Sequence, residues 1–98
     1  MNILKHVVMR GRVQGVGFRA FVEDAAQERY LEGWVRNRRD GTVEALLGGR
    51  REAVDAVIKT LQTGPSGAQV EAVDVKEGAP TQLEQRPRNT RFAVLPTT

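Results

Sequence analysis

The sequence predicts an α+β fold, in which an antiparallel sheet carries two helices packed on one of its faces. Three observations lead to this prediction. Several stretches alternate apolar and polar residues, as half-buried strands do. Two further stretches repeat their apolar residues at helical spacing, and loops rich in glycine or proline separate the stretches. With 98 residues, the chain is expected to form a single domain over residues 1–98.

The first predicted strand runs from Ile3 to Val13. Its alternation puts Val7 and Met9 on the face that suits the core, while the other face carries polar and charged residues. His6, the one histidine of the chain, lies on that second face. We therefore expect His6 to be an exposed surface residue rather than a metal ligand or a catalytic base.

The first predicted helix starts near Phe18 and continues to Leu31. Phe18, Val22 and Ala26 recur at helical spacing and form a stripe that we assign to the core. Gly33 is expected to stop the helix, because glycine readily adopts the left-handed conformation in which many helices end.

The rest of the chain predicts a hairpin, a second helix and two strands. Asp40-Gly41 lies between two alternating stretches, which is a strong signal for a hairpin turn. The expected elements are strands at Trp34 to Arg39 and Thr42 to Leu47, a helix at Arg51 to Thr63, a loop at Gly64 to Gly67, a strand at Gln69 to Glu77, a surface loop at Gly78 to Pro87 and a short last strand at Thr90 to Leu95. This order, βαββαβ plus a short C-terminal strand, is that of the ferredoxin-like split βαβ fold. Because that fold supports many unrelated functions, it does not by itself indicate an activity.

Composition limits the chemistry of the chain. There are no cysteines, which excludes disulfides, thiolate catalysis and cysteine-based metal sites. No apolar stretch approaches the ~20 residues of a membrane span, and the first residues lack the apolar core of a signal peptide. We therefore expect a cytoplasmic protein with no membrane partner. The net charge of +3 would suit anionic partners, but the arginines are spread along the chain as on an ordinary solvated surface.

The stretch that points most directly to chemistry is Gly11-Arg12-Val13-Gln14-Gly15-Val16-Gly17-Phe18-Arg19. Its glycines let the backbone turn sharply and expose N–H groups, and the helix that follows adds unpaired N–H groups and a partial positive charge. Arg19 lies in the first helical turn, where a cation is unfavourable unless a bound anion compensates it. Two interpretations stay open here: a phosphate site, or a plain turn with an exposed arginine.

Asn37 is the second polar candidate. In a split βαβ sheet, the tip of the hairpin lies at the same sheet end as the glycine-rich loop, so Asn37 comes within reach of that loop. Its amide offers a donor and an acceptor, which suits holding a water molecule beside an oxyanion. The alternative is that Asn37 only supports the turn, where asparagine is common.

Taken together, the two segments resemble the two signatures of the acylphosphatase family. The first is Gly11 to Arg19, and the second is Gly33-Trp34-Val35-Arg36-Asn37, followed by Asp40-Gly41. The resemblance extends over nearly the whole chain. It implies a metal-independent enzyme without a cofactor, which hydrolyses the carboxyl-phosphate bond of an acyl phosphate to a carboxylate and inorganic phosphate.

The resemblance also implies roles for single residues. Arg19 and Asn37 would be the catalytic residues, with Asn37 positioning the attacking water. The phosphate would be bound by Gly15, Val16, Gly17, Phe18 and Arg19. The sequence departs from many relatives at Arg38, where they carry a hydroxyl residue; Arg38 either adds positive potential beside the site or points away. Thr42 is a candidate to support the site instead.

Two other functions fit parts of the sequence. RNA can bind to the aromatic residues of such a sheet, but this chain has one Trp, one Tyr and three Phe, and no aromatic-rich RNA motif. The second alternative is a phosphate-sensing or carbamoyl-phosphate-handling domain detached from a larger enzyme. We expect a free-standing monomeric enzyme with a small-molecule acyl phosphate as substrate and no nucleic-acid partner.

Overall fold

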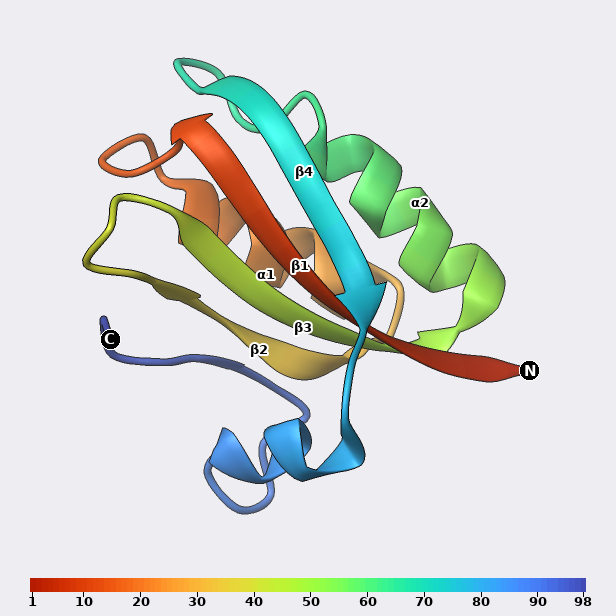
Figure 1. Cartoon of the computed structure of the whole chain (residues 1–98). Coiled ribbons are helices and arrows are strands. Elements are labelled where there is room, and N and C mark those ends of the chain that lie inside the picture. The colour runs from red at the N-terminus through yellow and green to blue at the C-terminus, as the bar shows by residue number, and fades with distance from the viewer.

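The computed structural model describes residues 1–98 and contains the predicted split βαβ arrangement (Figure 1). Its elements are β1 (Asn2–Arg12), α1 (Phe18–Glu28), β2 (Glu32–Asn37), β3 (Val43–Arg50), α2 (Arg51–Leu61), β4 (Gln69–Glu77), the 3₁₀ helix η1 (Pro80–Gln85) and β5 (Phe92–Val94). The predicted fold class is therefore confirmed. Neither α-helix has the length and apolar character needed to cross a bilayer.

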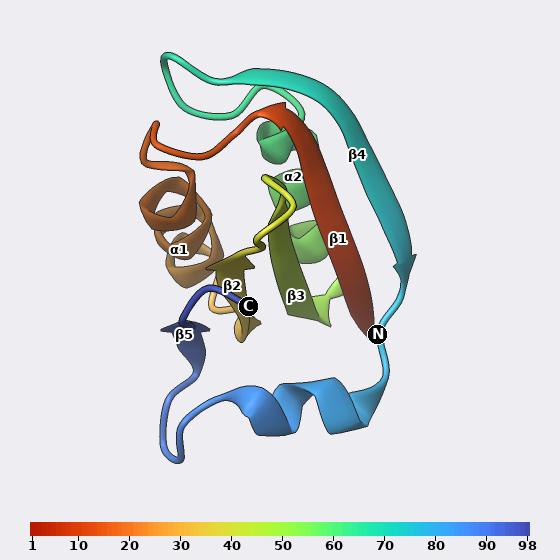
Figure 2. The same ribbon diagram turned by 60° about the vertical axis from the view of Figure 1, so that its left-hand side comes forward.

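The sheet has five strands in the order β4-β1-β3-β2-β5. β3 lies between β1 and β2 and is antiparallel to both, so β1 and β2 run in the same direction. Only β5 departs from the predicted antiparallel pairing, because it runs parallel to β2. The carboxyl ends of β1 and β2 therefore lie at one end of the sheet, where the chain enters α1 and turns into β3 (Figures 1 and 2).

Both helices cover the same face of the sheet, and the main core lies between them and the strands (Figure 1). The strands contribute the side chains of alternate positions, such as Val7 and Met9 on β1 and Val35 on β2. α1 contributes Phe18 and Val22, which belong to the stripe predicted from helical spacing.

The opposite face of the sheet is covered over part of its area. The predicted surface loop after β4 contains η1, and Leu83 of η1 packs against a small apolar cluster on this face. Trp34 of β2 donates its indole N–H to the carbonyl of Gln82 (2.8 Å), which fixes η1 to the sheet. The four buried members of the cluster are Trp34, Leu46, Ala93 and Leu95.

His6 is buried on this face, with only 5% of its surface exposed, so the prediction of a solvated histidine was wrong. Its ring packs edge-on to Trp34, and its Nε2 lies 2.6 Å from Glu44 Oε2. Glu44 comes from the neighbouring strand β3, and Trp34 comes from β2, one strand further along the sheet. Alternation within β1 alone assigned His6 to the correct face but did not reveal what the other strands place beside it.

α1 ends at Glu28, before the predicted end at Leu31. Tyr30 adopts a left-handed φ of 57°, its N–H donates to Gln27, and the N–H of Leu31 donates to Ala26. This is the hydrogen-bond pattern of a Schellman motif, in which Tyr30 occupies the position that glycine usually takes.

Gly33, the residue predicted to stop α1, lies inside β2 instead. Its φ of 141° is accessible to few other residues, and a Cβ there would lie 1.8 Å from the carbonyl oxygen of Leu46. The glycine is required because the backbone of β3 approaches closely, not because a helix ends.

Candidate active site

The loop between β1 and α1, residues 13–17, exposes a series of backbone N–H groups. Gly15 and Gly17 take left-handed φ values of 75° and 79°, and the space that a Cβ would fill at each is open. Gly17 is the N-cap of α1, and no side chain caps the helix. None of the N–H groups from Gly15 to Arg19 donates to an acceptor within the protein. The loop therefore offers amide donors at the positive end of a helix, an arrangement suited to a phosphate.

The far side of this loop is anchored in the core. Phe18 is 2% exposed, and the loop that follows α2 packs against its ring, since a Cβ at Gly64 would lie 2.8 Å from Phe18 Cε2. The same loop passes Val16, whose Cγ1 would lie 3.9 Å from a Cβ at Gly67. This packing holds the amide-bearing loop in place from the side opposite solvent.

Arg19 follows Phe18 in the first turn of α1 and is exposed. Its guanidinium takes part in none of the ion pairs of the molecule. A cation at this end of a helix opposes the helix dipole. Arg19 is therefore a free cation beside a loop of free N–H donors, and the protein supplies no anion to either.

Asn37 is the last residue of β2 and is half-buried. It lies two positions after Val35, which faces the main core, so Asn37 is on the sheet face that carries the helices. Its backbone pairs with Val43 of β3, and its carbonyl accepts from the N–H of Thr98 (3.1 Å). The backbone of Asn37 is thus held on both sides, while its side-chain amide has no partner among the side-chain hydrogen bonds of the molecule.

Gln14 connects the amide-bearing loop to the hairpin. Its Nε2 donates to the carbonyl of Arg38 (2.7 Å) and to the carbonyl of Thr42 (2.8 Å), on either side of the hairpin turn. The loop before Arg19 and the turn after Asn37 are therefore joined by one side chain. Gln14 is not among the site residues predicted from the sequence; its only signal there is a long uncharged polar side chain inside a glycine-rich loop.

The turn itself is closed by Asp40 and Thr42. The Thr42 hydroxyl (2.7 Å) and the Thr42 N–H (3.0 Å) both donate to Asp40 Oδ1, and these bonds hold the pKa of Asp40 below its ordinary value. Thr42 is thus engaged in shaping the turn. Arg38 directs its side chain to the other face of the sheet, where its Nε lies 3.7 Å from Glu44 Oε1.

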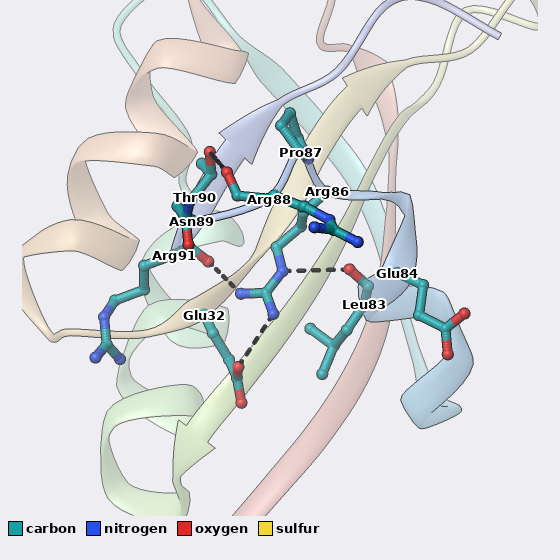
Figure 3. A pocket seen from close by; sticks show the side chains of 9 residues that line it. All are labelled: Glu32, Leu83, Glu84, Arg86, Pro87, Arg88, Asn89, Thr90 and Arg91. Carbon is teal, nitrogen blue, oxygen red and sulfur yellow. Dashed lines mark hydrogen bonds and ion pairs between the residues drawn. The ribbon is translucent and has the colours of Figure 1, made fainter.

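The largest hollow of the surface, about 760 Å³, lies elsewhere, in the loop between η1 and β5 (Figure 3). Arg86 crosses it, donating to the carbonyls of Leu83 and Arg91 and pairing with Glu32 at 3.5 Å. Glu32 begins β2 whereas Asn37 ends it, so the hollow is at the other end of that strand. Because the donors of Arg86 already hold the loop together, we assign this hollow a structural role.

The fold and the loop define a class of small α+β proteins with an amide-lined junction between the first strand and the first helix. The model of the acylphosphatase family matches residues 5–94 of the chain. An acylphosphatase of Rhodopseudomonas palustris (strain BisB18) is 52% identical over 96 residues, which cover 98% of this chain and 97% of that protein. The chain belongs to the acylphosphatase family and is an enzyme of the hydrolase class.

Solved structures agree with this assignment. An acylphosphatase from Bacillus subtilis superposes with a TM-score of 0.81 at 34% identity, with 97% of this chain and 99% of that chain covered. A similar unit also occurs within a larger protein: full-length HypF, solved with phosphate and nucleotide bound, matches with a TM-score of 0.82 at 25% identity over 99% of this chain but 12% of its own.

Proposed function

We propose that the protein hydrolyses the carboxyl-phosphate bond of acyl phosphates and releases a carboxylate and inorganic phosphate. The observation that carries the proposal is the run of N–H groups from Gly15 to Arg19 that lack an acceptor at the N-terminus of α1. Membership of the acylphosphatase family supports the same reaction.

In this proposal the amides of Gly15 to Phe18 and the Arg19 guanidinium bind the oxygens of the phosphoryl group. The guanidinium can donate two parallel hydrogen bonds to one phosphate. Phosphoryl transfer proceeds through a loose transition state that carries charge on the equatorial oxygens. Donors already fixed by the backbone stabilise that charge without reorganising during the reaction.

Asn37 orients the attacking water in line with the leaving oxygen. Its side chain has both a donor and an acceptor, and its backbone is fixed within β2. The leaving group is a carboxylate, which departs without protonation at neutral pH, so the reaction requires no general acid. A phosphate oxygen of the substrate accepts the proton of the water late in the reaction.

The decisive experiment compares wild type with Arg19→Ala in the hydrolysis of benzoyl phosphate. We expect kcat to fall by roughly 10²–10³ or more, because Arg19 binds the phosphoryl group and stabilises its charge. Circular dichroism should show an unchanged fold, since Arg19 is exposed and unpaired. Arg29→Ala, which removes an exposed arginine at the opposite end of α1, serves as the control. A folded Arg19→Ala protein with normal activity would refute the assignment.

Asn37→Ala separates water orientation from phosphate binding. We expect kcat to fall by about 10²-fold while the inhibition constant of inorganic phosphate stays the same, because the amides and Arg19 remain. Loss of phosphate inhibition with unchanged turnover of bound substrate would reverse the two roles.

The scheme uses no metal ion, because amides and a guanidinium supply the positive charge that the transition state needs. No group of three or more acidic or histidine side chains converges in the molecule. We expect benzoyl phosphate hydrolysis to continue at the same rate in excess chelator. Inhibition that added Mg²⁺ or Zn²⁺ reverses would contradict the scheme.

A further inference from the structure

A buried charged cluster lies behind the candidate site, on the sheet face opposite the helices. Its centre is Glu44 of β3, which is only 5% exposed. Glu44 Oε2 lies 2.6 Å from His6 Nε2 on β1, and Glu44 Oε1 accepts from Arg36 Nε on β2 at 2.7 Å. Arg38 Nε lies 3.7 Å from the same Oε1. We call His6, Arg36, Arg38 and Glu44 the Glu44 cluster.

The two arginines of the cluster are the immediate neighbours of Asn37. Arg36 precedes it and lies directly opposite Glu44 in the register of β2 and β3. Arg38 follows it at the start of the turn, where its N–H donates to the carbonyl of Thr42. Because side chains alternate along a strand, both arginines project to the face that Asn37 does not occupy. One carboxylate oxygen therefore holds the chain on both sides of Asn37 from behind the sheet.

Arg36 is restrained further. Its guanidinium stacks on the Trp34 ring at 4.7 Å from the ring centre, and its Nη1 donates to Gln85 Oε1 at 2.8 Å. The backbone at the end of β2 is therefore restrained next to Asn37.

Stability alone does not account for this cluster. Burying a carboxylate and its partners costs desolvation free energy, and apolar residues of similar volume are often as stable or more so. His6 adds to the cost, because its Nδ1 is buried without a hydrogen-bond partner. The cluster costs free energy to bury, and its hydrogen bonds fix the direction of its side chains. These two properties suit a role in positioning a neighbouring residue.

We propose that Glu44 is a positioning residue, which sets the placement of Asn37 through Arg36 and Arg38. This inference rests on the proposed role of Asn37 in orienting water. Without the carboxylate, the two guanidinium groups repel each other and the end of β2 shifts. A displacement of about 1 Å at a reacting group can cost up to 10²-fold in rate.

The test is a double-mutant cycle on benzoyl phosphate hydrolysis with Glu44→Gln and Asn37→Ala. We expect Glu44→Gln to lower kcat by about tenfold, with KM and the phosphate inhibition constant unchanged. In the Asn37→Ala background, Glu44→Gln should change kcat by less than about twofold, because the residue through which it acts is gone. Glu77→Gln, which removes an exposed carboxylate paired with Lys5 on the outer strand, is the control and should leave kcat at the wild-type value.

Two outcomes overturn the inference: a Glu44→Gln protein with wild-type kcat, or two losses that multiply in the double variant. If the proposed role of Asn37 is wrong, the result is different: Asn37→Ala alone then keeps the wild-type kcat. If Glu44→Gln does not fold, Arg38→Ala replaces it, since that side chain is 34% exposed and its loss leaves the Arg36 bond intact.

An independent readout is the side-chain amide signal of Asn37 in ¹H–¹⁵N spectra, assigned by its loss in Asn37→Ala. We expect it to move in Glu44→Gln or Arg38→Ala and to stay in place in Glu77→Gln. A merely stabilising carboxylate would lower the unfolding midpoint and leave this signal where it is, which would also overturn the inference.

Discussion

At the scale of single residues, the site depends on side chains that hold others in place as much as on those proposed to touch the substrate. Gln14 donates to two carbonyls of the hairpin turn, and Glu44 pairs with both neighbours of Asn37 on the opposite face of the sheet. Arg19 and Asn37 themselves make no side-chain bonds with the protein. The proposed supports are thus hydrogen-bonded within the protein, whereas the two proposed catalytic side chains are not.

Gln14→Leu should test the connection between loop and turn. Two hydrogen bonds would be lost, at a cost of about 0.5–1.5 kcal/mol each of the free energy of unfolding, while the carbonyls of Arg38 and Thr42 keep their backbone donors, the N–H groups of Gly41 and Arg38. We also expect kcat for benzoyl phosphate to fall, because the loop and the hairpin would move independently. Urea unfolding and steady-state kinetics provide the measurements. Gln27→Leu, on the exposed side of α1, is the matched control and should change neither.

The motifs indicated the two proposed catalytic residues but not the residues that support them. Arg19 and Asn37 lie in short signatures whose residue types and order can be read directly. The partners of Gln14 lie 24 and 28 residues further along the chain, and no local pattern indicates such bonds. The prediction that His6 is exposed was wrong for the same reason, because its surroundings come from β2 and β3.

At the scale of elements, strand and helix periodicity located every element except η1, and the end of α1 was misassigned. β4 was predicted from Gln69 to Glu77 and has those bounds. α1 was extended to Leu31 because Gly33 looked like the natural stop. A tyrosine in the left-handed position is uncommon, so residue preference favoured the wrong terminus. η1 was missed because a polar, proline-containing stretch has no apolar periodicity.

The unusual helix end gives a stability prediction. Tyr30→Gly should raise the free energy of unfolding by about 0.5–1 kcal/mol, because glycine adopts φ of 57° without the steric cost of a Cβ. Tyr30 is 79% exposed, so little packing is lost. Thermal unfolding should show a midpoint several degrees higher, roughly 4 °C for a domain of this size.

Tyr30→Ala is the control for this change. Alanine keeps the Cβ and therefore the strain, so its midpoint should not rise. A gain in Tyr30→Ala equal to that in Tyr30→Gly would show that the benefit comes from removing the ring and not from backbone geometry.

At the scale of the whole molecule, the two faces of the sheet differ in kind. One is sealed by α1 and α2 over an apolar core. The other is shared between an apolar half under η1 and a charged half that contains Glu44. The apolar stripes of the two helices predicted the core on the first face correctly. The second depends on β5, η1 and long-range pairing, which only the assembled sheet reveals.

This charged face makes stability depend on pH. Burial opposes the ionisation of Glu44, but hydrogen bonds from His6 and Arg36, with the charges of Arg36 and Arg38, outweigh it and hold the pKa of Glu44 below its ordinary value of 4.5. The folded protein thus binds fewer protons than the unfolded chain around that pH. The stabilisation is complete above about pH 5 and is lost as pH falls through the lowered pKa.

Urea midpoints between pH 7 and pH 3 measure this effect. We expect wild type to lose stability progressively below about pH 5, and Glu44→Gln to show a shallower loss, because one of the carboxyls responsible is gone. Asp40 and Glu77 also have lowered pKa values, so part of the slope will remain. An identical slope in wild type and Glu44→Gln would exclude Glu44 as a contributor.

The proposed phosphate donors of this loop are the main-chain N–H groups of Gly15 to Arg19, and this limits which substitutions can remove them. Main-chain donors are present whatever side chain a codon specifies, so alanine scanning across the loop would leave most of them intact. Only replacing an amide by an ester, or introducing an imino acid, removes such a donor. Drift in the neighbouring side chains is therefore tolerated, provided that the curvature of the chain persists.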